Sequence, residues 1–177
     1  MNLADLLTPL DSVFSKCKIR YAVIGGYAVA AWGEERATRD VDLLCDASDS
    51  KVLISALNEE HLHPEHRIGD EEDPISQVIR IALGTLAEPS EVDILIGIRG
   101  APAGILDRAR VVRIEGLAVP VASPEDMIIL KLLGGSGRDL EDARSIVQVQ
   151  GDRLDRNLTR GLCPSGLKDT LEKLMGS

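Results

Sequence analysis

The pattern of apolar and polar positions changes its period along the chain and so predicts alternating helices and strands. Between residues 3 and 16, apolar side chains recur every three or four positions, which is typical of an amphipathic helix, although Pro9 is expected to kink or split it. Short apolar runs bounded by glycine, proline or acidic residues indicate strands. The expected strands are 21–24, 40–46, 77–83, 91–96 (with Pro89 and Ser90 in the turn before it) and a stretch from 111 to 121 interrupted at Gly116. The other expected helices are 27–32, a helix capped by Ser48 or Asp49 that ends near 61, 103–110, 124–133, 138–150, 152–160 and 165–175.

These elements predict a mixed α/β (α+β) fold, in which a mixed sheet is flanked by helices and followed by a helical C-terminal part. The chain passes from the mixed part to the helical part at Ser123-Pro-Glu-Asp126. This segment supplies a helix cap, a proline at the first helical position and acids in the first turn. We therefore expect an α/β core over residues 1–122 and a helical region over residues 123–177 that packs on it.

Composition narrows the class of protein. The 177 residues suit one ordinary domain with a small helical appendage, and a hydrophobic share of 44% is enough for a core. The net charge of −9 disfavours a protein that coats duplex DNA by charge alone, but it allows a local basic patch for one nucleotide or one RNA end. No apolar run approaches the roughly 18 residues of a membrane span, so no membrane association is expected. Three widely spaced cysteines and the lack of a signal peptide suit the reducing cytoplasm.

Asp40 and Asp42 are the first candidates for chemistry. Side chains alternate along a strand, so both carboxylates are expected on one face, with Cα atoms about 6.6 Å apart at a rise of roughly 3.3 Å per residue. Asp93 lies in a second segment of the same layout, residues 91–96. If the two strands are neighbours at about 4.8 Å, Asp93 completes a three-carboxylate cluster suited to Mg²⁺. A chance Asp-x-Asp on a solvated sheet face is the competing interpretation in so acidic a protein.

Gly25 and Gly26 favour the metal-binding interpretation. They lie where a strand ends and a helix begins, so backbone N–H groups and the positive end of the helix can bind a phosphate. Glycine also lets a phosphate approach the backbone closely. An ordinary strand-to-helix turn would explain two glycines alone, but here only residues 27–39 separate them from the acidic pair.

The combination closely resembles the signature of the nucleotidyltransferase superfamily with the polymerase-beta-like fold, a Gly-Gly or Gly-Ser turn followed by hydrophobic-Asp-hydrophobic-Asp. Residues 23–44, VIGGYAVAAWGEERATRDVDLL, are most similar to the small bacterial group that includes the AbiEii-type toxins. The segment VDIL around Asp93 matches the place of the superfamily's third carboxylate. Residues 123–146, SPEDMIILKLLGGSGRDLEDARSI, resemble the C-terminal helical motif of the same group.

The resemblance implies a nucleotidyltransferase that moves a nucleoside monophosphate from a nucleoside triphosphate such as ATP to a hydroxyl acceptor, with two Mg²⁺ ions or Mn²⁺ in their place. It assigns Asp40 and Asp42 to the metals that bridge the triphosphate, and Asp93 to the catalytic metal and to deprotonation of the acceptor. An RNA end, a protein hydroxyl and an antibiotic are the open acceptors. The toxin-like resemblance favours RNA or protein and implies an antitoxin partner. Gly26 replaces the serine of many active members, so a catalytically silent relative that binds a nucleotide or a partner protein is the alternative.

Four further residues are candidates for binding the nucleotide. Arg36, Thr38 and Arg39 precede the acidic strand, where an arginine would offset triphosphate charge, and local ion pairs in a solvated loop are the alternative. Lys131 lies on an apolar helix, an unusual place for a lone cation, and either contacts the triphosphate or extends to the surface.

Two other patterns are expected to be structural. Gly134-Gly-Ser-Gly137 lacks the Gly-Lys-Ser/Thr ending of a phosphate loop and is expected to join two helices. The three histidines, all within residues 61–66, are expected in a polar surface turn rather than at a metal site. Trp32, on a short alanine-rich helix, is expected in the core.

Overall fold

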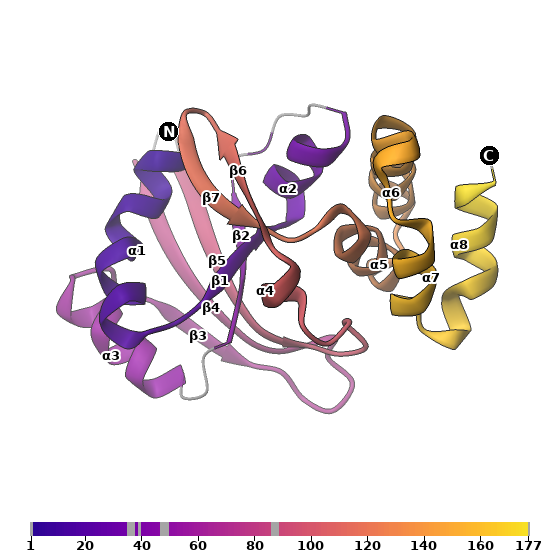
Figure 1. Cartoon of the computed structure of the whole chain (residues 1–177). Helices are drawn as coiled ribbons and strands as arrows, with labels where there is room; N and C mark the ends of the chain where they lie inside the picture. Colours follow the sequence, from indigo (N-terminus) through magenta and orange to yellow (C-terminus); the bar gives the residue numbers. More distant parts are fainter. Residues whose placement is uncertain (1, 35–37, 39, 47–49, 86–88, 177) are drawn as a thin grey trace.

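The computed structural model describes residues 2–34, 38, 40–46, 50–85 and 89–176. Seven strands form one mixed sheet in the order β3-β4-β5-β2-β1-β7-β6, with helices on both sides (Figure 1). The strands are β1 (Tyr21–Ile24), β2 (Val41–Cys45), β3 (Glu65–Ile68), β4 (Ile75–Gly84), β5 (Pro89–Ile98), β6 (Arg110–Ile114) and β7 (Leu117–Val121). The α-helices are α1 (Leu3–Cys17), α2 (Gly25–Trp32), α3 (Ser50–Glu59), α4 (Ile105–Arg108), α5 (Pro124–Gly134), α6 (Gly137–Gln150), α7 (Arg156–Leu162) and α8 (Lys168–Met175).

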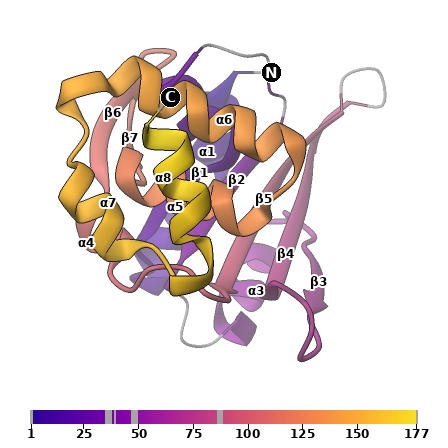
Figure 2. The same cartoon turned by 90° about the vertical axis from the view of Figure 1, so that its right-hand side faces the viewer.

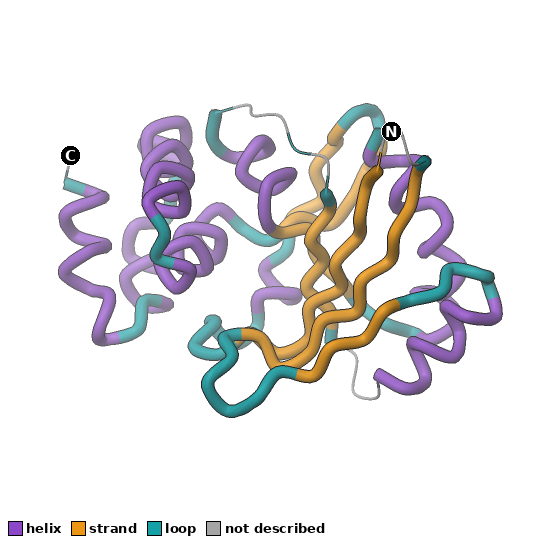
Figure 3. The backbone as a smooth tube through the Cα atoms, turned by 180° about the vertical axis from the view of Figure 1, so that it is seen from behind, coloured by secondary structure: helices purple, strands orange, loops and turns teal. Residues whose placement is uncertain are grey.

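The sheet lies between two groups of helices, as the mixed fold predicted from the sequence requires. Helices α1 and α3 cover one face, while α2 and the C-terminal helices lie on the opposite side (Figures 1 and 3). Figure 2, viewed from that side, shows α5 to α8 in front of the sheet. The C-terminal helices therefore leave part of this face, over β3, β4 and β5, open for a site.

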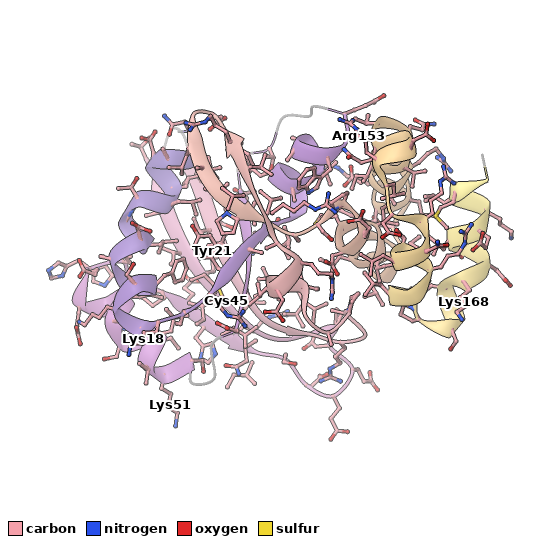
Figure 4. The ribbon with its side chains drawn as sticks, viewed as in Figure 1. Lys18, Tyr21, Cys45, Lys51, Arg153 and Lys168 are labelled. Carbon is pink, nitrogen blue, oxygen red and sulfur yellow. The ribbon has the colours of Figure 1, made fainter. Side chains whose placement is uncertain are left out.

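Helix α1 is continuous through Pro9, so the expected split does not occur, whereas the kink stays a prediction. Its first turn is held by a capping box between Asn2 and Asp5, and its apolar stripe is buried from Leu3 to Phe14. These contacts keep the helix intact although a proline removes one hydrogen bond. Phe14 packs on Tyr21, with ring centroids 4.9 Å apart. Tyr21 lies at the start of β1 (Figure 4).

The sequence pattern placed most elements correctly but missed β3, one of the two edge strands. All four residues of β3 are exposed, so no alternation of apolar and polar positions marks it. Pro89 and Ser90 belong to β5 rather than to the turn before it, and a proline is tolerated at the first residue of a strand. The expected helix at 103–110 is shortened to α4 because the chain enters β6 at Arg110. The two expected caps, Ser48 and Asp49, lie outside the described residues.

Two ion pairs with buried carboxylates hold the start of α5 against the sheet side of the molecule. Asp126 and Glu125 have fully buried side chains, and they pair with Arg108 of α4 at 2.6 Å and with Arg110 of β6 at 2.9 Å. Glu125 also accepts a hydrogen bond from the backbone N–H of Asp155 before α7. The position of the C-terminal helices is thus tied to α4 and β6. The division into domains at residue 122 stays a prediction.

Trp32, at the end of α2, is half-buried rather than fully in the core. Its indole Nε1–H donates to the carbonyl oxygen of Ala122 at 2.7 Å, and its ring lies under the guanidinium of Arg110. Within the described parts of the chain, no helix is long and apolar enough to cross a membrane.

Candidate active site

One row of residues crosses five neighbouring strands on the open side of the sheet. In this row Asp93 of β5 lies opposite Asp42 of β2, because these two strands pair in parallel. Asp42 lies opposite Ile24, the last residue of β1, on its other side. Beyond Asp93 follow Arg80 of β4 and then Glu65 of β3. The predicted pairing of the two aspartate strands is therefore confirmed, with adjacent strands about 4.8 Å apart.

Asp42 packs directly on Gly25, the first residue of α2. A Cβ atom at Gly25 would lie 1.9 Å from Oδ2 of Asp42, and the φ angle of Gly25 is +61°. Only glycine adopts this conformation at no steric cost while leaving space for the carboxylate. The carboxylate lies at the positive end of a helix, where negative charge is stabilised. Gly26 follows as a buried residue of the first turn.

Asp40 differs from the expectation, since it lies just before β2 and is exposed. Its Oδ1 accepts a hydrogen bond of 3.2 Å from the backbone N–H of Glu91, while the hydroxyl of Thr38 donates to its carbonyl oxygen at 3.3 Å. Arg36 and Arg39 lie outside the described residues. The strand therefore begins one residue later than predicted, and Asp40 is turned toward the neighbouring chain segment.

Asp93 is held by an arginine that the sequence did not mark as functional. Arg80 donates from Nε to Oδ1 of Asp93 at 2.8 Å and from an Nη to Oδ2 at 2.7 Å. The same Nε lies 3.2 Å from Oε2 of Glu91. The hydrogen bonds and charge of Asp93, followed by the charges of Glu91 and Asp40, raise the pKa of Arg80 above its ordinary value. Arg80 is thus a permanent cation among the carboxylates of Asp93, Glu91 and Asp40.

The carboxylates could hold a divalent ion only together with ligands from elsewhere. In the portion of the chain that the structure describes, no three His, Cys, Asp or Glu side chains are grouped to hold a metal ion. The expected three-carboxylate cluster is therefore not assembled, because Asp40 faces Glu91 and Asp93 is paired with Arg80. Asp42 and Asp93 nevertheless lie in register, and Mg²⁺ is commonly bound by one or two carboxylates plus substrate phosphates. The donor set fits such an ion, and the metal assignment stays a prediction.

Two hollows flank the contact between Asp42 and Gly25. The first has a volume of about 530 Å³ and extends over β3 to β5. Its charged lining consists of Asp42, Asp93, Arg80, Glu65 and Arg67. The second, of about 240 Å³, lies between the start of α2 and α5 and is mostly apolar. Its lining includes Gly25, Met127, Leu130, Lys131 and Arg99.

Lys131 lines the second hollow, but its ammonium is occupied by two acids of α6. Its Nζ lies 2.9 Å from Oδ1 of Asp139 and 2.9 Å from Oδ2 of Asp142, whose side chain is 8% exposed. The side chain therefore does not extend to the surface as a lone cation would. Its contact with a triphosphate stays a prediction. For such a contact, the ammonium would have to bind a phosphate in addition to Asp139 and Asp142.

The Lys131 pair predicts a specific dependence of stability on pH. Burial by itself would raise the pKa of Asp139, but hydrogen bonds from Ser136 and Lys131 lower it below the ordinary 3.8. A lowered pKa stabilises the fold above the ordinary value, and this contribution is lost as the pH falls through the lowered one. We expect Lys131→Met to reduce the free energy of unfolding by about 1–3 kcal/mol at pH 7 and to flatten its acid dependence.

Urea unfolding of both proteins at several pH values between 7 and 3 measures this difference. The gap between them should narrow below the ordinary pKa of Asp139. A gap that stays constant with pH would mean that the ion pair contributes nothing and that Lys131 acts through packing alone.

The expected joint between two helices at residues 134–137 is confirmed, whereas the expected polar turn with the three histidines is confirmed only in part. Gly134 ends α5, Gly135 is its left-handed C-cap, and Ser136 caps α6, so this segment joins two helices. Of the histidines, His66 lies in β3 rather than in a turn, and its Nε2 lies 3.0 Å from Oε1 of Gln77.

Comparison with known proteins supports the fold. The sequence profile of a family described as "Nucleotidyl transferase of unknown function (DUF2204)" matches residues 4–162. The structure is similar to a solution structure of the antibiotic-resistance factor ANT(2'')-Ia, with a TM-score of 0.57, 16% identity and coverage of 97% of this chain and 94% of the other. No curated protein matches the sequence significantly.

Two further solved structures are similar over most of their length. One is an antigenic nucleotidyltransferase-like protein from Paracoccidioides brasiliensis, with a TM-score of 0.56, 19% identity and coverage of 99% of this chain and 94% of the other. The other is ANT(2'')-Ia in complex with adenylyl-2''-tobramycin, with a TM-score of 0.56, 18% identity and coverage of 89% and 94%. At these identities the likeness supports the fold, and the chemistry has to be argued from the site.

Proposed function

Because the chain belongs to the nucleotidyl transferase family DUF2204, we propose that it transfers a nucleoside monophosphate from a nucleoside triphosphate to a hydroxyl acceptor. The observation that carries this proposal is the register of Asp42 with Asp93 on neighbouring parallel strands, beside Gly25 at the start of α2. Two carboxylates and a helix N-terminus are thus brought together at one point. The pair suits a divalent ion, and the helix end suits the phosphates that the ion accompanies.

Each residue has a distinct role in this proposal. Gly25 and Gly26 offer backbone N–H groups to the phosphates, while Asp42 and Asp93 hold Mg²⁺, or Mn²⁺ in its place. Asp40 assists from the start of β2, and Lys131, Thr38, Arg36 and Arg39 are the further candidates for nucleotide contacts. The metal would neutralise the triphosphate and lower the pKa of the acceptor hydroxyl.

The reaction is an in-line displacement at the α-phosphorus. A bond forms between the acceptor oxygen and this phosphorus, and the bond to the leaving pyrophosphate breaks. The hydroxyl proton passes to Asp93, which lines the larger hollow from which the acceptor would approach. Positioning and charge neutralisation supply most of the rate, as in other phosphoryl transfers.

The acceptor is proposed to be an RNA end or a protein hydroxyl, as in a toxin-like protein with an antitoxin partner in the cytoplasm. All three cysteines are free thiols, which suits that compartment. An amino-sugar hydroxyl is the other acceptor to test, because a structural neighbour carries an adenylylated tobramycin.

A labelling experiment tests the proposal. The protein is incubated with Mg²⁺ and each α-labelled nucleoside triphosphate, either with a whole-cell extract or with an aminoglycoside. We expect label in one class of acceptor, with equal release of pyrophosphate and no reaction in EDTA. The absence of both label and pyrophosphate for every triphosphate would contradict the proposal.

A catalytically silent relative that binds a nucleotide is the second candidate. Gly26 stands where many active members have serine, and both oxygens of Asp93 are already paired with Arg80. Calorimetry with each triphosphate and Mg²⁺ separates the two candidates when it is combined with the labelling experiment. Binding without label or pyrophosphate supports the silent relative.

A further inference from the structure

Arg80 occupies the carboxylate that the proposed reaction needs for its metal. We propose that Arg80 is a built-in competitor of the divalent ion, which keeps Asp93 neutralised until metal binds and then moves across β4 toward Glu65. This inference rests on the proposed function, because it concerns the same metal site. It makes Arg80 a positioning residue that sets how tightly the site binds metal.

The contacts show that Arg80 and a metal would compete. Its guanidinium uses both oxygens of Asp93, at 2.8 and 2.7 Å, in the two-pronged geometry that arginine forms with carboxylates. A divalent ion at Asp93 requires at least one of these oxygens and places its own charge beside the guanidinium. Binding of the ion therefore competes with the full Arg80 pair.

Exposure indicates which of the two partners would move. The side chain of Asp93 is 19% exposed, whereas that of Arg80 is 47% exposed and lines the larger hollow. Arginine has a long flexible stem and stays protonated in proteins, so it leaves a carboxylate by rotation and not by losing its proton. Asp93 can therefore stay in place for the ion while the guanidinium swings away.

The sheet offers Arg80 a second acid. Glu65 of β3 lies directly opposite Arg80 on the side away from Asp93, and it lines the same hollow. Residues directly opposite each other on paired strands have Cβ atoms about 4.5–5.5 Å apart, within reach of a guanidinium. Arg80 thus stands between two carboxylates in one row and has a partner in either position.

Electrostatics explains why such a residue is needed. Asp40 and Asp42 lie at the start of β2, and Glu91 and Asp93 lie on the neighbouring β5. Like charges held this close repel each other. Arg80 contacts two of these acids and reduces the repulsion in the metal-free protein. A divalent ion brings twice the positive charge and makes the arginine dispensable at Asp93.

Titration with Mn²⁺ in the presence of a saturating non-hydrolysable nucleoside triphosphate, followed by calorimetry, tests the competition without any turnover, because the phosphates supply the ligands that the two carboxylates lack. Arg80→Gln is expected to bind Mn²⁺ about tenfold more tightly than the wild type, in the range of measured coupling between sites. Arg80→Lys, which keeps the charge but loses the two-pronged pair, should lie between them. The matched control is Arg67→Gln, an arginine of β3 that lines the same hollow, and its Kd should equal that of the wild type.

Two more variants assign the effect to the proposed partners. In Arg80→Gln/Asp93→Asn the tighter binding should disappear, and Glu65→Gln should weaken Mn²⁺ binding a few-fold because Arg80 loses its second position. An unchanged Kd in Arg80→Gln and Arg80→Lys would overturn the proposal, as would tighter binding that survives the loss of Asp93. So would a failure of every variant to bind Mn²⁺.

These outcomes are separable from a failure of the proposed function. If Arg80→Gln binds Mn²⁺ more tightly but no variant transfers nucleotide, the competition is supported and the transfer reaction is wrong. If the wild type transfers nucleotide and its Kd for Mn²⁺ does not depend on Arg80, only the competition is wrong.

Discussion

Replacing Gly25 with alanine is expected to reduce nucleotide transfer about as strongly as replacing Asp42 with asparagine, by roughly 100- to 1,000-fold in kcat. A methyl group at Gly25 would lie 1.9 Å from Oδ2 of Asp42, a distance that no pair of non-bonded heavy atoms tolerates, so the carboxylate has to leave its position. Displacement of a metal ligand by about 1 Å can cost two orders of magnitude in rate. Pyrophosphate release, measured with the acceptor found by labelling, gives the rates.

Gly116→Ala is the matched control for this experiment. Gly116 lies in the turn between β6 and β7 with a φ of +86°, and no atom lies within 4 Å of the Cβ that alanine would add. Both variants force alanine into the left-handed region, which costs roughly 1–2 kcal/mol of stability. If the two variants lose the same free energy of unfolding but only Gly25→Ala loses transfer activity, the loss of activity is caused by the contact between the new methyl group and Asp42. Equal transfer rates in the two variants would mean that the Asp42 carboxylate does not need this position.

The centre of the site could be predicted because its signals are local. Strand alternation places Asp42 on one face, two glycines mark the start of a helix, and Asp93 repeats the same layout on a second strand. Resemblance to one superfamily then joined these segments in the order that the sheet confirms. The role of each residue stays a prediction. The structure does show that Asp42 lies beside both Asp93 and Gly25.

Arg80 could not be found in this way because its importance comes from register. In the sequence it stands between Ile79 and Ile81 as the polar position of an ordinary alternating strand. Only the antiparallel pairing of β4 with β5 places it opposite Asp93. Nothing near Arg80 in the chain indicates a carboxylate partner thirteen residues away.

The acids at the start of α5 show the same limit. Glu125 and Asp126 were correctly interpreted as first-turn acids of a helix, a role that an exposed helix would fill equally well. Their complete burial depends on arginines 15 and 18 residues earlier, in β6 and α4. Local sequence thus predicts where the helix begins, while tertiary packing decides what its acids hold.

Replacing Arg108 with methionine is expected to reduce the free energy of unfolding by about 3–5 kcal/mol. The Asp126 side chain is 0% exposed, and Arg108 holds it with contacts of 2.9 Å to Oδ2 and 2.6 Å to Oδ1. Methionine keeps much of the apolar stem but leaves a buried carboxylate without its cation, which costs more than the loss of packing. Guanidinium chloride unfolding at pH 7 measures the change.

The control is Arg160→Met, which breaks the exposed pair with Glu172 on α8, whose side chains are 45% and 53% exposed. Solvent-exposed pairs contribute about 0–1 kcal/mol, so this variant should unfold almost as the wild type does. Adding Asp126→Asn to Arg108→Met should recover part of the lost stability, because it removes the unpaired charge. Equal losses in the Arg108 and Arg160 variants would show that the buried pair does not hold α5 to α4. In that case the wall of the smaller hollow, which α5 supplies through Met127, Leu130 and Lys131, must be positioned by the Arg110–Glu125 pair and by apolar packing.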